Sequence, residues 1–300
     1  MEKNYFKKLV ISDYPAVVRC TAGLYNNSES SFSTMYMWQH YSNVGYYIEN
    51  DVLYSLFLNK KGYYASFMPY GKNRNSHEII DKLGNMYNKL NSPLEINLCT
   101  EDFVDFLIKS KRYNVTISEI RNSFDYVYRT EDLINLPGRK YHSKKNHINS
   151  FRKKFPYEYV RYNSDLKDAC LSFCDNILKQ HYSTDIVGYE SEFFSIKKTF
   201  DSLESLNLKC GILMLDNRII ALSVGERLNK DFALIHIEKA DYEYRSAYSV
   251  INNLFLKNEF SDTMFVNREE DMGIEGLRIA KQSYHPCNLI KKYKVIIDLK

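Results

Sequence analysis

The order of helices and strands predicted for the second half of the chain constrains the fold more than any other feature. Residues 157–163 alternate aromatic or β-branched side chains with polar ones, which is typical of a strand. Two stretches with apolar residues at helical spacing follow, and then three strands separated by short polar turns. Helix, strand, helix and strand complete the order. The predicted ranges are 157–163, 164–182, 189–206, 208–216, 218–227, 231–239, 246–260, 263–267, 274–284 and 288–299. Because strands and helices do not alternate strictly, this order predicts an α/β fold (α+β, with mixed sheets) rather than a doubly wound parallel sheet.

The first half of the chain repeats the end of this order. After a helix over 14–25, three predicted strands form a meander, and helix, strand, helix and strand follow. The ranges after the first helix are 43–50, 52–59, 62–70, 77–90, 94–100, 101–110 and 113–121. The shared run of elements predicts an internal duplication of the fold. We therefore predict two modules, residues 1–137 and residues 138–300.

A basic segment, "RKYHSKKNHINSFRKK" over 139–154, opens the second of these modules. It contains seven cations and no acid, and its apolar side chains fall near one helical face before Pro156. Four of the cations, Arg139, Lys140, Lys144 and Lys145, are candidates for binding the phosphates of a nucleic-acid backbone. A solvated helix face explains the same pattern equally well, and docking on anionic lipid is a third interpretation.

Composition and motifs narrow the class of protein. With 44% hydrophobic and 26% charged residues the chain is globular. Because it has no run of about 18 apolar residues and no signal-peptide core, we expect a cytoplasmic protein with no stable membrane insertion. The six cysteines form no CxxC pair, and neither HExxH nor HxxxH is present. We therefore expect free thiols and no metal site.

Two long stretches resemble the DUF2156 family, which is related to the C-terminal domain of phosphatidylglycerol lysyltransferase. They are "LINLPGRKYHSKKNHINSFRKKF" and "NREEDMGIEGLRIAKQSYHPCNLIKKYKV", and "FMPYG" at 67–71 is similar to the family as well. The element order also resembles the GNAT acyltransferase fold. The resemblance implies two tandem GNAT-like modules, as in Fem-type aminoacyltransferases. It also implies aminoacyl-tRNA as donor, and a small-molecule or lipid head-group acceptor. The tRNA phosphates would then be bound by Arg139, Lys140, Lys144 and Lys145.

The glycine-bearing loop that cradles the pyrophosphate of coenzyme A in GNAT enzymes is missing. Arg245, Ser246 and Ala247 stand where that loop would begin the helix over 246–260. Because side chains hinder the close approach of backbone N–H groups to phosphate, we expect no cofactor. Acyl-coenzyme A as donor remains the alternative.

Three consecutive acids follow the strand over 263–267. In a GNAT-like sheet this strand separates from the strand before it, and the donor and acceptor meet in the gap. The predicted catalytic residues, as base, ammonium contact or acid, are Glu238, Glu269, Glu270, Asp271 and Tyr284. The predicted substrate-binding residues are Asn267, Arg268, Arg278 and Lys281.

Each of these residues also has a structural interpretation. Acids before a helix cap it, the arginines pair with the acids, Tyr284 packs at a helix end, and Lys281 lies on the surface. His236, in mid-strand, is interpreted as a core residue or as one that merely faces out from the strand. Three functions stay open: an aminoacyl-tRNA-dependent acyltransferase, a coenzyme A-dependent N-acyltransferase, and a non-enzymatic module that binds tRNA or another anion.

Overall fold

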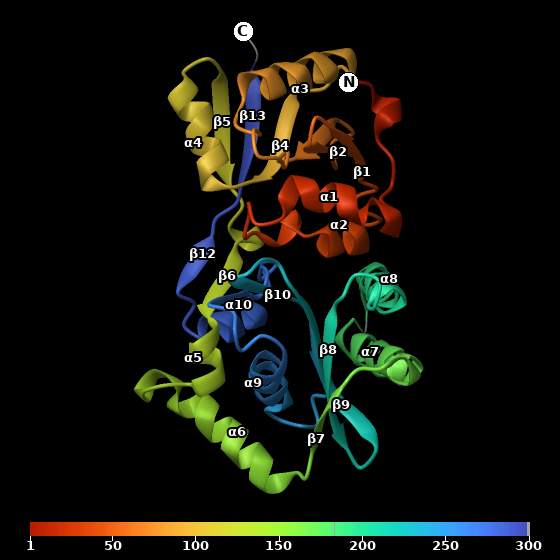
Figure 1. The fold of residues 1–300 in the computed structure, drawn as a ribbon, viewed down its shortest axis with the longest axis vertical. Helices are drawn as coiled ribbons and strands as arrows, with labels where there is room; N and C mark the ends of the chain where they lie inside the picture. The colour runs from red at the N-terminus through yellow and green to blue at the C-terminus, as the bar shows by residue number, and fades with distance from the viewer. Residues whose placement is uncertain (183, 299–300) are drawn as a thin grey trace. The chain divides into compact units, whose positions relative to one another are not determined.

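The computed structural model describes residues 1–182 and 184–298 (Figure 1). Contacts divide the chain into two compact units. The first contains Met1–Tyr126, Glu270–Ile279 and the described residues from Leu289 onward, and the second contains Val127–Glu269 and Ala280–Asn288. The predicted modules, 1–137 and 138–300, follow the order of the chain, whereas each compact unit takes segments from both halves.

The first unit is built on a six-stranded mixed sheet. Its order is β1-β2-β3-β4-β13-β5, in which β3 and β4 are parallel and the other neighbours are antiparallel. The strands are β1 (Gly45–Glu49), β2 (Val52–Leu58), β3 (Tyr64–Phe67), β4 (Leu94–Cys99), β5 (Asn114–Glu119) and β13 (Tyr293–Asp298). The helices are α1 (Tyr14–Thr21), α2 (Phe32–Trp38), α3 (His77–Lys89) and α4 (Glu101–Ser110). The elements predicted between residues 14 and 121 are therefore confirmed, and α2 is an additional helix.

The closing strand predicted over 288–299 is divided. Its first part, β12 (Asn288–Ile290), joins the second sheet, and its second part, β13, lies between β4 and β5 of the first sheet. Val295 and Ile297 of β13 are buried there. Assigning the whole strand to the second module was wrong, because alternation of side chains identifies a strand but not its partner.

The second unit is built on a seven-stranded sheet with the order β12-β6-β11-β10-β9-β8-β7. Its other strands are β6 (Asp125–Arg129), β7 (Glu158–Arg161), β8 (Lys209–Leu215), β9 (Arg218–Arg227), β10 (Phe232–Ala240) and β11 (Phe265–Asn267). Its helices are α5 (Thr130–Asn135), α6 (His142–Lys154), α7 (Lys167–His181), α8 (Ile186–Ser202) and α9 (Ala247–Glu259), and α10 (Glu275–Gln282) crosses between the units. The predicted order is confirmed, but the sequence analysis missed β6, which pairs antiparallel with β11.

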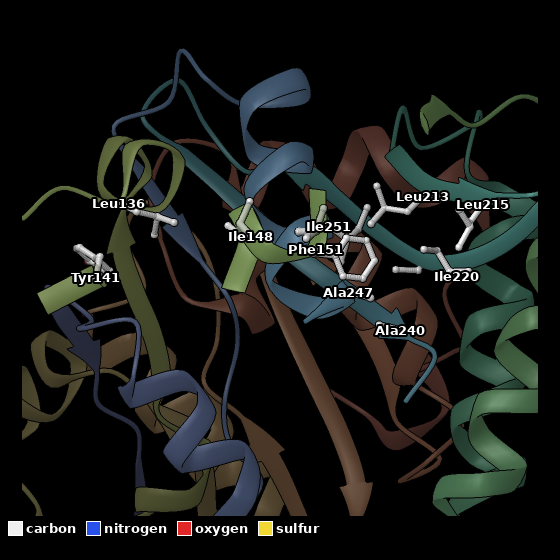
Figure 2. Close-up of a cluster of buried hydrophobic side chains, with 12 residues drawn as sticks. Leu136, Tyr141, Ile148, Phe151, Leu213, Leu215, Ile220, Ala240, Ala247 and Ile251 are labelled. Carbon is white, nitrogen blue, oxygen red and sulfur yellow. The ribbon is translucent and has the colours of Figure 1, made fainter. Parts of the chain in front are cut away.

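The basic helix α6 packs its apolar side against its own unit. Ile148 and Phe151 are buried in a cluster with Ala247 and Ile251 of α9 and with residues of β8 and β9, such as Leu213 (Figure 2). The apolar side of α6 is therefore used inside the protein, which leaves its cations for solvent or for a ligand. Within residues 1–182 and 184–298, no helix is long and apolar enough to cross a membrane.

Candidate functional site

Strands β10 and β11 separate soon after they begin. They are parallel and pair at three positions, the last being Leu234 with Asn267, where β11 ends. Strand β10 continues to Ala240, and its pairing with β9 shifts between Ile235 and Ile237, so that His236 lies in a β-bulge. Bulges re-aim side chains and are common beside active sites. The side chains of β10 after Leu234 therefore lie along an edge that β11 does not cover.

Glu238 lies on this uncovered edge and forms an ion pair with Arg268, which follows β11. Arg268 Nη2 donates to Glu238 Oε1 at 2.8 Å, and Asn252 Nδ2 of α9 donates to Glu238 Oε2 at 3.1 Å. The two charged side chains are only 14% and 12% exposed. Because removing charges from water is costly, a nearly buried pair of this kind is a candidate for function rather than a source of net stability.

Two aromatic rings hold the Arg268 guanidinium. Its Cζ lies 5.1 Å from the ring centre of Tyr284 and 5.7 Å from that of Tyr128. Lys144 of α6 approaches the same Tyr284 ring, with Nζ 4.1 Å from its centre. Burial and the nearby Arg268 lower the pKa of Lys144. Two cations therefore meet at one tyrosine, and one of them comes from the basic helix.

The Tyr284 hydroxyl is engaged inside the protein. It donates to Ser249 Oγ at 3.0 Å, and Tyr284 is buried. Burial raises the pKa of Tyr284, so the phenol stays protonated at neutral pH. This geometry agrees with the packed tyrosine of the structural interpretation.

His236 bridges two carboxylates, an arrangement that the interpretation as a core residue missed. Its Nδ1 lies 3.0 Å from Glu269 Oε1 and its Nε2 lies 3.1 Å from Glu226 Oε1. Burial lowers the pKa of His236, but the hydrogen bonds and charges of the two carboxylates outweigh it and raise the pKa to about 9. The imidazolium donates from both nitrogens and fixes Glu269, whose φ is +55°. No sequence signal pairs His236 with Glu269, because they lie 33 positions apart.

Asn267 and Lys281 hold the backbone of the turn after β11. Asn267 Oδ1 accepts from the Glu269 N–H at 2.8 Å. The Lys281 ammonium donates to the carbonyls of Arg268 and Glu269, and Lys281 is 9% exposed. These contacts give both residues a positioning role, because they fix the turn that carries Arg268 and Glu269.

Asp271 is fully engaged within the first unit. It is buried, and its carboxylate accepts from Arg121 at 3.2 Å, Tyr126 at 2.7 Å, Arg278 at 2.8 and 2.9 Å, and the Gly273 N–H at 2.9 Å. Burial raises the pKa of Asp271, but the hydrogen bonds from Arg278, Tyr126 and Gly273 hold it well below its usual value. A carboxylate that already accepts this many hydrogen bonds is a weak base. The geometry therefore favours a structural anchoring role for Asp271 and Arg278.

Glu270 lies in the first unit, close to a buried lysine. Lys292 is fully buried and donates to Asp125 Oδ1 at 2.6 Å, to the Glu29 carboxylate at 2.5 Å and to Ser28 Oγ at 3.1 Å. Burial lowers the pKa of Lys292, but the charges of Asp125, Glu29 and Glu270 raise it above its usual value. Lys292 was not predicted from the sequence, because a single lysine before a strand carries no pattern.

The predicted site residues are thus distributed over both units. The second unit contains Glu238, Asn267, Arg268, Glu269, Lys281, Tyr284, Arg139, Lys140, Lys144 and Lys145, and the first contains Glu270, Asp271 and Arg278. Of the seven cations over 139–154, only Lys140 forms an ion pair with a described residue, Asp132, at 3.8 Å. Among the residues that the structure describes, no group of His, Cys, Asp or Glu is arranged to hold a metal ion.

The turn before α9 differs from a phosphate-binding loop. Ser246 precedes the helix with φ +82°, a conformation that favours glycine. A serine held there places a side chain at the start of the helix.

The sequence matches the family described as "Phosphatidylglycerol lysyltransferase, C-terminal" over residues 23–296. The chain belongs to this family. An uncharacterised protein of Mycoplasmoides gallisepticum is 26% identical over 236 residues, which cover 76% of this chain and 74% of the relative.

Solved structures show the same fold over nearly the whole chain. A conserved protein of unknown function from Bacteroides thetaiotaomicron is 29% identical, with a TM-score of 0.90 and coverage of 98% of this chain and 99% of the other. The structure of L-PGS from Bacillus licheniformis is 10% identical, with a TM-score of 0.67 and coverage of 97% and 93%. The predicted fold class, an α/β protein with mixed sheets, and the predicted family are confirmed.

Proposed function

We propose that this protein is an acyltransferase that moves an aminoacyl group from aminoacyl-tRNA to an amine or hydroxyl of a small-molecule or lipid head-group acceptor. The nearly buried Glu238–Arg268 pair on the uncovered edge of β10 carries the proposal. Membership of a family named for phosphatidylglycerol lysyltransferase supports the class of reaction. Fold alone does not define chemistry, so the proposal rests on these side chains.

The proposed reaction transfers the aminoacyl group directly from the ribose oxygen of the tRNA to the nitrogen or oxygen of the acceptor. The acceptor nitrogen or oxygen attacks the carbonyl carbon of the aminoacyl ester, the bond from that carbon to the ribose oxygen breaks, and the acceptor proton passes to the ribose oxygen. Glu238 is the carboxylate best suited to binding the α-ammonium or relaying this proton, because its two oxygens accept one hydrogen bond each, from Arg268 and Asn252. Glu269, held by His236, is the second candidate.

The basic helix supplies a surface for the donor's phosphates. Lys145 and Arg139 are exposed, and Lys144 links this surface to Arg268 through the Tyr284 ring. Contacts between cations and phosphates position a nucleic acid without reading its sequence. A surface of this kind suits the acceptor end of different charged tRNAs.

The test measures transfer of labelled amino acid from charged tRNA. The acceptors are phosphatidylglycerol vesicles, glycerol phosphate and a peptide with a free amine, and a parallel arm replaces the donor by labelled acetyl-coenzyme A. We expect transfer from tRNA, and a loss of at least about 100-fold in Glu238→Gln, the scale of a lost acid–base group. Glu192→Gln is the matched control, because it removes an ion pair to the neighbouring β10 residue, Lys239, with side chains 20% and 17% exposed.

Each alternative outcome has a distinct consequence. Equal losses in both variants, with equal falls in melting temperature, would reduce the role of Glu238 to stability. Tight tRNA binding with no transfer to any acceptor would indicate that the protein is a non-enzymatic tRNA-binding module. Transfer from acetyl-coenzyme A alone would favour the coenzyme A-dependent alternative.

A further inference from the structure

Three buried polar atoms around Glu238 have no hydrogen-bond partner. Within the described residues they are Ser223 Oγ, Asn252 Oδ1 and Arg268 Nη1. The other atoms of this kind, on Asn27, Thr34 and Glu49, belong to the first unit. A buried polar atom without a partner costs free energy, so each one calls for an explanation, such as a ligand or a bound water.

The residues that carry these three atoms are all neighbours of Glu238. Asn252 and Arg268 each use one nitrogen to bond Glu238, which leaves Asn252 Oδ1 and Arg268 Nη1 unused. Ser223 of β9 is the direct cross-strand partner of Glu238, so the two side chains share a face of the sheet. Ser223 and Asn252 are 0% and 2% exposed.

These groups offer more hydrogen-bond acceptors than donors. Ser223 Oγ, Asn252 Oδ1 and Glu238 Oε2 offer three acceptors, whereas Arg268 Nη1 is a donor. An ammonium group has three N–H donors and no acceptor, and a carbonyl oxygen has acceptors only. An α-aminoacyl ester carries both groups on adjacent carbons.

We infer that Ser223, Asn252 and Glu238 bind the α-ammonium of the transferred aminoacyl group, while Arg268 Nη1 binds its carbonyl oxygen. This inference rests on the proposed function and deepens it. As the acceptor attacks, the carbonyl electron pair moves onto the oxygen that faces Arg268 and returns when the bond to the ribose oxygen breaks. The site selects donors with a free α-amine, whatever their side chain.

Selectivity of the wild-type protein is the first test. Its kcat/KM is measured with one aminoacyl-tRNA and with the same tRNA N-acetylated on the amino acid. We expect the free α-amine to be preferred by at least about 100-fold, because N-acetylation removes the charge and two donors. Equal use of both donors would overturn the inference and leave the proposed function standing, whereas no transfer from either would refute the proposed function itself.

Ser223→Ala separates binding from stability. It breaks no hydrogen bond within the protein and removes an unpartnered hydroxyl, so we expect an unchanged or higher melting temperature. We also expect kcat/KM for the free-amine donor to fall about tenfold, with little change for the N-acetylated donor. Ser202→Ala, at a buried serine that bonds within α8, is the control. Wild-type kcat/KM in Ser223→Ala would show that only water fills this place, and would overturn the inference.

Arg268→Lys tests the carbonyl contact. Lysine keeps a positive charge beside Glu238 but lacks the second nitrogen of the guanidinium fork. We expect kcat to fall about 100-fold for free and N-acetylated donors alike, the scale of a lost oxyanion donor. A loss confined to the free-amine donor would contradict the role of Arg268 Nη1.

Discussion

The charge on His236 makes stability depend on pH in a defined window. The His236 side chain is fully buried between Glu226 and Glu269, and its pKa rises from 6.5 to about 9 in the folded protein. A raised folded-state pKa contributes stability that is complete below about pH 6.5 and is lost as the pH rises through 9. A pKa raised from 6.5 to about 9 corresponds to about 3 kcal/mol, at about 1.36 kcal/mol for each pKa unit. Above this window the neutral ring donates to only one of the two carboxylates.

His236→Gln isolates this contribution, because the variant keeps a hydrogen-bonding side chain but no charge. The free energy of unfolding is measured by urea titration at pH 6.5, 7.5, 8.5 and 9.5 with far-ultraviolet circular dichroism, since the sole tryptophan, Trp38, belongs to the first unit. We expect the variant to be less stable at pH 6.5 and the difference from wild type to narrow by about 3 kcal/mol toward high pH. Groups that titrate equally in both proteins cancel in the difference.

His181→Gln is the matched control, because His181 is exposed at the end of α7 in the same unit. Its stability should follow the wild type at every pH. If the difference in free energy of unfolding between His236→Gln and the wild type stayed constant from pH 6.5 to 9.5, the imidazolium bridge would be refuted.

Two further predictions concern Asp271 and the basic helix. Asp271→Asn should cost about 1–3 kcal/mol, because it weakens the charge-assisted hydrogen bonds from Arg121 and Arg278, whose side chains are 33% and 32% exposed. Calorimetry beside Asp262→Asn, an exposed pair with Arg227, checks this, and equal melting temperatures would contradict it. Since the pKa of Asp271 is lowered, its contribution is present at neutral pH and is lost as the pH falls through the acid range. The double variant Arg139→Ala, Lys145→Ala should weaken tRNA binding and reduce the slope of log Kd against log salt by about 0.7–0.9 per lost phosphate contact, because both cations are exposed. Filter binding measures the slope, the exposed pair Lys60 and Lys61 provides the control, and an unchanged slope would exclude tRNA from this surface.

Local patterns predicted the elements, but they did not predict which strands pair. The three-strand meanders and the helices of both halves follow from periodicity and turn residues, which act over a few positions. Strand β6 has the required aromatic and β-branched residues, Tyr126, Val127 and Tyr128, but it was missed. The partners of β6 and β13 lie more than 130 positions away, and no local signal specifies them.

The candidate site shows the same limit. The family motif pointed to Arg268, and the gap beside the end of the preceding strand pointed to Glu238; the structure brings the two together. The acids that follow were treated as one cluster, yet Glu269 bonds His236 in one unit and Asp271 bonds Arg278 in the other. Neighbours in sequence need not share an environment where the chain passes between compact units.

The position of β13 has a consequence for folding during synthesis. Strands β4 and β5 are complete by Glu119, but they are joined in the sheet only by β13, which begins at Tyr293. At about 5–20 residues per second, a ribosome needs roughly 9–35 s to make the chain between these two positions. During that time the edges of β4 and β5 that will receive β13 are unpaired, and unpaired edges favour aggregation. The first unit therefore cannot finish folding before the second has been made, and a chain released before β13 leaves the first sheet open.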